Sequence, residues 1–255
     1  MTITLVIPTL RRYDLLDRCV SSACTGSCPP THIHVIDNGA TLPAHIRNSL
    51  EHHAALAGAQ LLLSRPGRNL GVAASWNQGL HQAPGDWLIV SNDDVVFYHA
   101  TIERLVVAAE AKPDALFWFP GAAGYKNAWS CFLQRAASLT EIGPYDEWIS
   151  PGYGYFEDND YSYRLQLAGH MHQPVRGCGY GHVESATIKA LPADGMADHW
   201  RRFRLAENRY AQKWGGAPGA ERYTIPFNGT PPDDYQRSRY EQGRSHFYPT
   251  GDVHE

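Results

Sequence analysis

The stretch Leu88-Ile-Val-Ser-Asn-Asp-Asp-Val-Val-Phe97 joins an apolar run directly to two adjacent carboxylates. The apolar run predicts a buried strand over residues 87–90. Asp93 and Asp94 repel each other, and their burial at a strand end is costly unless a cation or a hydrogen-bond donor compensates their charge. A hard divalent cation that also binds phosphate oxygens is a natural partner. The alternative is an aspartate-rich turn that caps a helix beginning near Thr101.

Strand and helix signals alternate on both sides of this stretch, which is typical of βαβ units in a parallel sheet. The predicted strands cover residues 3–7, 33–36, 60–64, 87–90, 116–119 and 132–135. The predicted helices cover residues 14–23, 43–57, 72–81, 101–111, 161–168 and 196–214.

Ligands of open α/β sheets bind at the carboxyl ends of the strands, so the residues there are candidates for a binding site. The polar residues at these positions are Pro8-Thr9, Asp37-Asn38, Arg65, Arg68-Asn69 and Asn92-Asp93-Asp94. The first strand is followed by neither a GxGxxG nor a GxxxxGK[ST] motif. A dinucleotide or P-loop site of the glycine-cradled kind is therefore not expected.

Composition favours a folded, soluble protein over a disordered or membrane-spanning one. The chain has 255 residues, is 43% hydrophobic and 19% charged, and carries a net charge of −4 with a pI near 6.3. No apolar run approaches the roughly 20 residues that a membrane span requires. The N-terminus has no signal-peptide pattern, and the five cysteines are an odd number, so we expect a cytoplasmic protein with free thiols. Zinc binding by Cys19, Cys24 and Cys28 with His32 and His34 is disfavoured because CxxC pairs are lacking.

A second acidic cluster, Glu157-Asp158-Asn159-Asp160, precedes the predicted helix over residues 161–168. Asp158 or Asn159 is expected at the N-cap, and Gly169 follows the helix end. Capping explains one of these carboxylates well and three of them poorly. The functional interpretation is that one carboxylate serves as a general base beside an acceptor hydroxyl.

A histidine emerges from the glycine-rich run Gly177-Cys-Gly-Tyr-Gly-His182. Small neighbours allow such an imidazole to approach a metal ion closely. The chain has 13 histidines, however, and a single histidine is more often a surface or core residue. His182 is thus a candidate ligand only in combination with the acidic clusters.

Six sequence blocks follow one another along the chain. They are Val6-Ile-Pro-Thr-Leu-x-Arg12, Val35-Ile-Asp-Asn-Gly39, Asn69-Leu-Gly-Val-Ala-Ala-Ser-Trp-Asn77-x-Gly79, Ser91-Asn-Asp-Asp94, Leu139-x-x-Ile-Gly-x-Tyr-Asp-Glu147 and Phe156-Glu-Asp-Asn-Asp160-x-x-x-Arg164-x-x-x-Ala-Gly169. In these blocks and their order, the chain resembles the inverting family-2 glycosyltransferases of the GT-A fold. The chain resembles in particular the rhamnosyltransferase-like branch of this family, over residues 2–185. The resemblance implies a mixed, mostly parallel Rossmann-like sheet flanked by helices, with a C-terminal helix and an extended tail.

The resemblance also implies roles for individual residues. Asp158 falls on the position of the catalytic base, and Asp94 and His182 on those of the ligands of a divalent cation, Mn²⁺ or Mg²⁺. Nucleotide-binding positions fall on Pro8, Thr9, Asp37, Asn69, Gly71, Asn92 and Asp93. Acceptor or donor-sugar contacts are expected for Glu157, Trp129 and Arg164. The block Asn92-Asp93-Asp94 takes the place of the family's DxD motif, with an asparagine at its first position.

The implied activity is metal-dependent, inverting transfer of a sugar from a nucleotide-diphosphate donor, preferably UDP- or dTDP-linked, to an acceptor hydroxyl. The acceptor is a glycan, a lipid, a protein or a modified nucleobase. The expected domain covers residues 1–216, with a nucleotide-binding half at 1–97 and an acceptor-binding half at 98–216. Residues 217–255 are expected to form an arm that packs on this body or on a neighbouring subunit of a homo-oligomer.

Two other classes of function remain. A non-catalytic module could use the sugar-nucleotide pocket for binding or as a scaffold, although such a module has no need of a base at Asp158. A nucleotidyltransferase is less consistent, because its basic, glycine-rich phosphate loop is absent from Pro8-Thr9-Leu10-Arg11-Arg12. A nucleobase acceptor is disfavoured by the net charge. The arginines of the last helix and the tail are expected to form a solvated face or subunit contacts: Arg201, Arg202, Arg204, Arg209, Arg237, Arg239 and Arg244.

Overall fold

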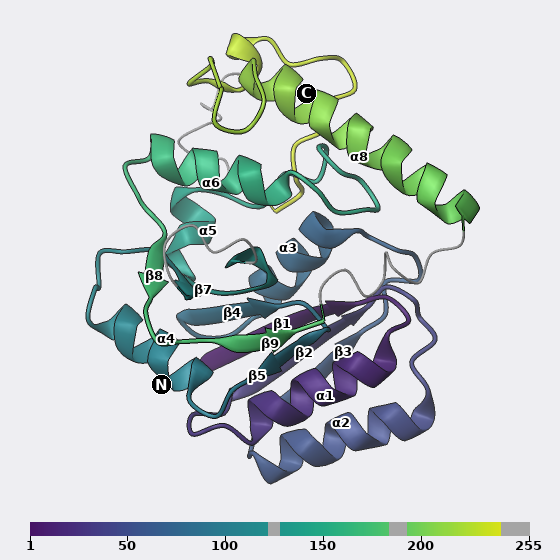
Figure 1. The fold of residues 1–255 in the computed structure, drawn as a ribbon, viewed down its shortest axis with the longest axis vertical. Helices are drawn as coiled ribbons and strands as arrows, with labels where there is room; N and C mark the ends of the chain where they lie inside the picture. The colour runs from purple at the N-terminus through teal and green to yellow at the C-terminus, as the bar shows by residue number, and fades with distance from the viewer. Residues whose placement is uncertain (122–127, 184–192, 241–255) are drawn as a thin grey trace. The chain divides into compact units, whose positions relative to one another are not determined.

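The computed structural model describes residues 1–121, 128–183 and 193–240 (Figure 1). The chain forms two compact units whose segments alternate along the sequence. The first unit comprises residues 1–69, 78–136 and 171–190, and the second comprises residues 70–77, 137–170 and 191–255. Helix α3 (Val72–Gln82) contributes residues to both units.

The first unit is built on a seven-stranded sheet with the order β3-β2-β1-β4-β7-β6-β8. Strands β3, β2, β1 and β4 are parallel, β7 is antiparallel to both β4 and β6, and β8 is parallel to β6. The strands are β1 (Ile3–Thr9), β2 (His32–Asp37), β3 (Gln60–Ser64), β4 (Trp87–Ser91), β6 (Phe117–Pro120), β7 (Cys131–Arg135) and β8 (Gln173–Val175). The predicted mixed, mostly parallel sheet is confirmed.

Three helices bury their apolar faces against this sheet: α1 (Tyr13–Cys24), α2 (Ala44–Leu56) and α4 (Thr101–Glu110). Helices α1 and α2 lie side by side (Figure 1). The alternating residues Ile3, Leu5 and Ile7 of β1 belong to this core. Val6 points to the opposite face, where a Cβ at Gly79 of α3 would lie 2.2 Å from the Val6 side chain. Glycine is therefore needed there for the helix to approach the sheet.

A separate two-stranded ribbon pairs β5 (Val95–Phe97) with β9 (Tyr180–His182) in antiparallel register. Val95 lies opposite His182, so the ribbon brings residues from distant parts of the chain together. Each strand has three residues, which is too few for an alternating apolar pattern to be recognised. Neither of these strands was predicted from the sequence, and nor was β8.

The second unit contains α5 (Ala137–Glu141), α6 (Glu157–Leu167), α8 (Ala193–Trp214) and a 3-10 turn, η2 (Pro226–Gly229). Its aromatic core includes Trp148, Trp214 and Phe227, and the rings of Trp148 and Phe227 are 5.4 Å apart. Residues 217–240 of the expected C-terminal arm thus contribute to this unit. The remainder of that arm, residues 241–255, lies outside the described residues.

A buried network of four charges joins α6 to α8 in this unit. Lys213 lies within 2.6 Å of both Asp146 and Asp160, and Arg164 pairs with Asp160 at 2.8 Å. Burial alone would raise the pKa of Asp160, but the charges of Arg164 and Lys213 and the hydrogen bonds from Lys213 and Trp214 hold it below its usual value. Removing one partner from such a network leaves an uncompensated charge, at a cost of about 3–5 kcal/mol.

The start of α6 differs from the prediction. The helix begins at Glu157, four residues before the predicted start, and its N-cap is Phe156 in a left-handed conformation with φ 66°. The N-cap expected at Asp158 or Asn159 is wrong because both residues lie inside the helix. The helix starts earlier at Glu157, whose carboxylate folds back and accepts the Tyr155 N–H. Glu157, Asp158 and Asp160 therefore lie inside the first turn, where the helix dipole stabilises negative charge.

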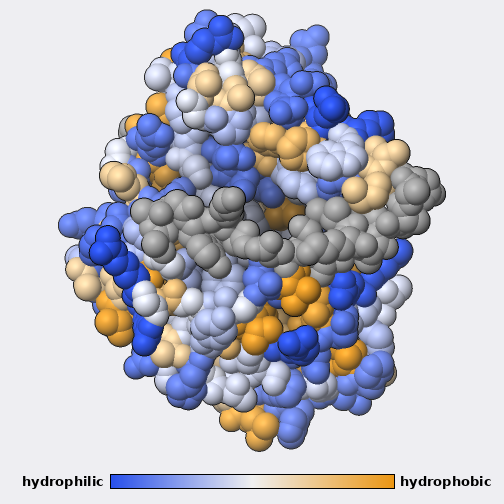
Figure 2. All heavy atoms as spheres, viewed as in Figure 1, coloured by the Kyte–Doolittle hydropathy of each residue, from blue (hydrophilic) through white to orange (hydrophobic). Residues whose placement is uncertain are grey.

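On the face seen in Figure 2, apolar residues occur in small groups among hydrophilic ones. No helix within the described part of the chain is long and apolar enough to cross a bilayer.

Candidate active site

The carboxyl ends of three neighbouring strands bring several predicted residues to one edge of the sheet. Thr9, at the end of β1, lies in register with Asp37, at the end of β2. The turn Asn92–Asp94 follows β4, which pairs with the other side of β1. The Thr9 hydroxyl donates a 2.6 Å hydrogen bond to Asp93 Oδ2, so β1 and the acidic turn are directly connected.

Asp93 lies in a setting that favours hydrogen bonding to hydroxyl groups. Burial raises its pKa to about 6, and the charge of Asp94 acts in the same direction. The Thr9 hydroxyl and the Leu10 N–H partly offset this shift. A carboxyl group of this kind binds hydroxyls of a ligand readily, which is the chemistry that a ribose offers.

Asp37 orders the turn that follows β2. Its carboxylate is 1% exposed and accepts hydrogen bonds from the Tyr13 hydroxyl at 2.8 Å, the Leu42 N–H at 3.1 Å and the Gly39 N–H at 3.2 Å. Arg65 Nε is 3.7 Å away. These contacts explain the buried charge, and a contact between Asp37 and a nucleotide stays a prediction. Pro8 in β1 and the exposed Asn69 are the other predicted nucleotide contacts in this unit.

Asp94 and His182 come together through the β5–β9 ribbon. Val95 pairs with His182 in this ribbon, and the Val183 N–H donates a hydrogen bond to the Asp94 carbonyl at 3.1 Å. Asp94 Oδ1 then lies 3.0 Å from His182 Nε2, and both side chains are 10% exposed. Within the described residues, the buried Nδ1 atom of His182 has no hydrogen-bond partner.

This pair fits a divalent cation. A carboxylate oxygen and an imidazole nitrogen are common ligands of Mn²⁺, and two adjacent ligands of an octahedral ion, at about 2.1 Å each, are separated by about 3.0 Å. The observed separation of 3.0 Å agrees with this value. No cluster of three or more His, Cys, Asp or Glu side chains suited to a metal occurs in the part of the chain that the structure describes.

Trp129 lies in an aromatic cluster beside the same turn. The Asn92 N–H donates to the Ser130 carbonyl at 2.8 Å, which fixes the turn to the segment that carries Trp129. The partly exposed Trp129 ring is 4.8 Å from the Phe117 ring and 5.5 Å from the ring of His172. Burial lowers the pKa of His172 to about 4, so this histidine is neutral and its surroundings are apolar.

Glu157 and Asp158 form a pair of adjacent carboxylates at the start of α6, in the second unit. Burial raises the pKa of Glu157 to about 8, and the charge of Asp158 adds to the shift. The pKa of Asp158 is also raised by burial, although its side chain stays partly exposed and its Oδ1 accepts the Asn159 N–H at 2.8 Å. The two groups titrate as a pair, and such shifted carboxylates are suited to proton transfer near neutral pH.

The loop before this pair is strained. Tyr155 has φ 150° and Phe156 has φ 66°, and neither residue is a glycine. Each such conformation costs on the order of 1–3 kcal/mol and persists only where the surrounding structure enforces it. The hydrogen bond from the Tyr155 N–H to Glu157 is one such restraint.

Gly71 lies against the same loop. It has φ 82°, and the neighbouring Val72 N–H donates to the Tyr153 carbonyl. A Cβ at position 71 would lie 2.4 Å from both the backbone N and O of Tyr153. This close backbone approach accounts for the glycine, and the nucleotide contact expected of it stays a prediction.

Arg164, a tentative sugar contact, lies in the interior of the second unit. It is 1% exposed and donates to Asp160 and to the carbonyls of Ile142 and Pro144, at 2.7–2.9 Å. These bonds give it a structural function, whereas a sugar contact stays a prediction. The sequence pattern did not show this burial because an arginine four residues after Asp160 is also typical of an exposed ion pair on a helix surface.

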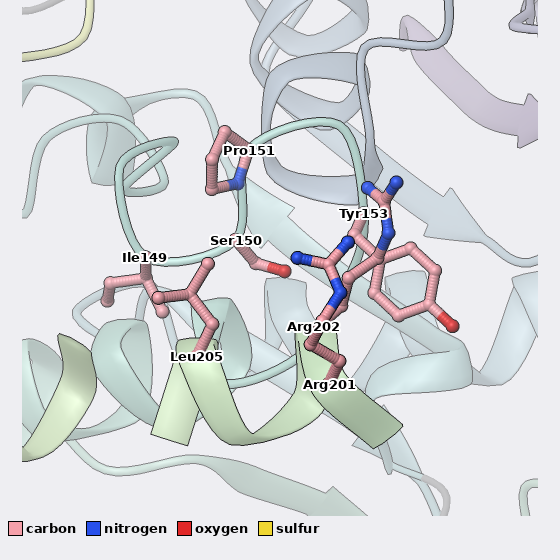
Figure 3. A pocket seen from close by; sticks show the side chains of 7 residues that line it. All are labelled: Ile149, Ser150, Pro151, Tyr153, Arg201, Arg202 and Leu205. Atoms are coloured by element: carbon pink, nitrogen blue, oxygen red, sulfur yellow. The ribbon is translucent and has the colours of Figure 1, made fainter. Parts of the chain in front are cut away.

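The second unit also holds a pocket of about 130 Å³ that the sequence did not reveal (Figure 3). One wall is the loop segment with Ile149, Ser150, Pro151 and Tyr153, and the other is α8 with Arg201, Arg202 and Leu205. The arginines of this helix were expected on a solvated face or in subunit contacts. Their apposition to a loop about 50 residues earlier is a tertiary contact that no local pattern reports.

Comparison with known proteins identifies the family. The model of glycosyl transferase family 2 matches residues 4–168, and the chain belongs to this family. The mannosyltransferase PcManGT from Pyrobaculum calidifontis, solved with GDP-Man and Mn²⁺, has a TM-score of 0.58 at 13% identity. The S. aureus protein TarS has a TM-score of 0.57 at 14% identity, and its fragment 1–349 in complex with UDP has 0.56 at 13%. These likenesses confirm the predicted GT-A fold.

The similarity covers different shares of these proteins. It includes 82% of this chain and 69% of PcManGT, but 71% of this chain and 36% of TarS, or 59% of the TarS fragment. The chain thus spans about a third of full-length TarS. A comparison with curated proteins gave no match.

The contact at Gly71 predicts a stability difference between two glycine substitutions. Gly71→Ala places a Cβ against the Tyr153 backbone, whereas Gly169→Ala at the end of α6 has a similar φ of 81° and no atom within 4 Å. We expect Gly71→Ala to lower the free energy of unfolding by at least about 2 kcal/mol more than Gly169→Ala, as overpacking adds to backbone strain. Urea unfolding monitored by circular dichroism measures both, and equal losses would contradict the contact.

Proposed function

We propose that this chain is a metal-dependent, inverting glycosyltransferase of the rhamnosyltransferase-like branch, which moves a sugar from a nucleotide-diphosphate donor to an acceptor hydroxyl. The UDP- and dTDP-linked sugars are the preferred donors. The observation that carries the proposal is the distance of 3.0 Å between Asp94 Oδ1 and His182 Nε2, in a chain that belongs to glycosyl transferase family 2. Asp94 lies in the turn that follows β4. The nucleotides bound to related folds, UDP in TarS and GDP-Man in PcManGT, agree with a sugar-nucleotide donor.

In the donor site, Asp94 and His182 would hold Mn²⁺ or Mg²⁺. When bound, the cation supplies positive charge to a leaving diphosphate. Thr9 and Asp93, joined by their hydrogen bond, would bind the ribose and fix the orientation of the nucleotide. The remaining nucleotide contacts are proposed for Pro8, Asp37, Asn69, Gly71 and Asn92.

Asp158 would act as the general base. The acceptor oxygen forms a bond to the anomeric carbon while the bond from that carbon to the diphosphate breaks, and the hydroxyl proton moves to the Asp158 carboxylate. Attack opposite to the leaving group inverts the anomeric configuration. The raised pKa of Asp158 strengthens it as a base, and its partial exposure leaves it accessible to an acceptor.

The proposal is tested first by nucleotide binding. Calorimetric titration with UDP, dTDP and GDP should show binding of one nucleotide that is strengthened by Mn²⁺, and Asp94→Ala should remove the Mn²⁺ dependence. Asp86→Ala, which deletes an exposed carboxylate of the same unit, should leave it intact. An unchanged metal titration in Asp94→Ala would count against the ligand assignment. If no nucleotide binds under any condition, the result supports a non-catalytic scaffold instead of an enzyme.

Substitution of the base should separate chemistry from binding. Asp158→Asn retains the size of the side chain but cannot accept the proton, so transfer should fall by about 10²–10⁴-fold while nucleotide affinity changes little. Donor hydrolysis, in which water replaces the acceptor, is a suitable assay. Asp233→Asn, an exposed matched control in the same unit, should retain both properties. An equal loss of nucleotide binding and turnover in Asp158→Asn would contradict the assignment of Asp158 as the base.

The paired carboxylates predict how turnover depends on pH. Asp158 can accept a proton only in its deprotonated form, and burial raises the pKa values of both carboxyl groups. Turnover should therefore fall as the pH drops below about 8 and the pair becomes fully protonated. The charge of Asp158 contributes to the raised pKa of Glu157, so Asp158 ionises first, while Glu157 is still neutral. Glu157→Gln reproduces this neutral form and should leave the limb in place, as should Asp233→Asn. A limb that moves to lower pH in Glu157→Gln would contradict this order of ionisation.

A further inference from the structure

The pocket between the 149–153 loop and α8 has two arginines in its wall (Figure 3). Arg202 Nε donates to Asp198 at 2.6 Å, and Arg201 binds the same carboxylate through Nε and Nη2. Asp198 is the one carboxylate paired with these two cations in the described part of the chain. The cluster thus keeps a net positive charge.

The arginines retain hydrogen-bond donors for a ligand. Within the described residues, Arg202 uses only Nε, so both terminal nitrogens remain, and Arg201 retains Nη1. The Arg202 guanidinium lies 5.5 Å from the centre of the Tyr153 ring, which holds it over the pocket by a cation–π contact. Burial raises the pKa of Tyr153, so its phenol stays neutral and adds no negative charge.

We infer that this pocket binds a phosphate group of the acceptor substrate. Two guanidinium groups can each bind a separate oxygen of a tetrahedral phosphate, and the buried Ser150 in the same wall can supply a hydroxyl donor. The volume of about 130 Å³ is well above the roughly 10–15 Å³ that a single water needs on the same measure, so the pocket has room for a group larger than a water. The inference rests on the proposed function and names the chemical class of its acceptor.

The loop that lines the pocket is close in sequence to the proposed base. Tyr153 is five residues before Asp158, and the intervening loop is fixed by the strained Tyr155–Phe156 pair and by Glu157. The hydroxyl of Tyr153 is also hydrogen-bonded to His199 of α8. Occupation of the pocket would therefore act on the segment that leads into the base.

Two exposed apolar side chains accompany the arginines. Leu205 lines the pocket and is 44% exposed, and Trp200 on the same helix is 53% exposed. Exposed tryptophan, leucine and arginine side chains on one helix are residue types found at membrane interfaces, and Trp200 lies about 140° from Leu205 around α8. The phosphate could thus belong to a lipid headgroup or to a soluble phosphorylated acceptor, and the chemistry of the pocket is the same for both.

The test uses inorganic phosphate in the presence of EDTA, which removes cations from the donor site. Calorimetry should show binding by the full chain and at least about tenfold weaker binding by the double variant Arg201→Gln/Arg202→Gln, since charge-assisted hydrogen bonds are lost. Arg204→Gln removes a charge from an exposed position on the same helix that does not line the pocket, and should stay within about twofold of the wild type. Acetate should bind more weakly than phosphate.

Three outcomes overturn the inference: no phosphate binding by the wild type, equal weakening in Arg204→Gln, or acetate binding as tight as phosphate. A sedimentation assay with phosphatidylcholine vesicles, with and without phosphatidic acid, identifies the source. Binding to phosphatidic acid vesicles that is lost in the double variant and in Trp200→Ala supports a lipid headgroup, whereas phosphate binding without vesicle binding supports a soluble acceptor. Because these titrations use no nucleotide, they remain interpretable if the donor proposal fails, and failure here leaves the UDP titration unaffected.

Discussion

The parallel pairing of β1 with β2 on one side and β4 on the other is the constraint on which the first unit depends. Backbone hydrogen bonds fix Thr9 opposite Asp37 and place the turn after β4 at the same edge. A shift of one residue in this register would exchange the two faces of β1 and turn Ile3, Leu5 and Ile7 away from their helices. The apolar core therefore fixes the register, and the register sets which polar side chains meet at the strand ends.

The sequence predicted the long, regular elements well, because their apolar periodicity is local. Strand β1, helix α1 and strand β4 follow directly from such patterns. The ribbon of β5 and β9 could not be found in this way, since its strands have three residues each and their pairing joins positions more than 80 residues apart. The resemblance to a family nevertheless placed Asp94 and His182 in one metal site, and the structure brings these two side chains to 3.0 Å. Their function as ligands stays a prediction.

The start of α6 shows a different limit. Sequence rules assign the N-cap to a residue whose side chain can bond to the helix N-terminus, and Asp158 or Asn159 satisfied those rules. The helix instead begins directly after two non-glycine residues with positive φ, Tyr155 and Phe156. The carboxylate of its first residue, Glu157, accepts the Tyr155 N–H and its own N–H. Local propensity does not predict such strain, because the cost is met by tertiary contacts elsewhere in the unit.

The first turn of α6 also holds carboxylates in two different electrostatic settings. Asp160 is buried between Lys213 and Arg164, and their charges lower its pKa, so it is a stable anion that holds two helices together. Glu157 and Asp158 lie in the same turn, yet no cation pairs with either of them in the described part of the chain, and their pKa values are raised. Burial without a compensating charge destabilises the fold, and carboxylates with pKa values shifted in this way cluster at functional sites. Of the three carboxylates, Asp158 combines this uncompensated charge with partial exposure, which is the property that a general base requires and that Glu157, enclosed by its own loop, lacks.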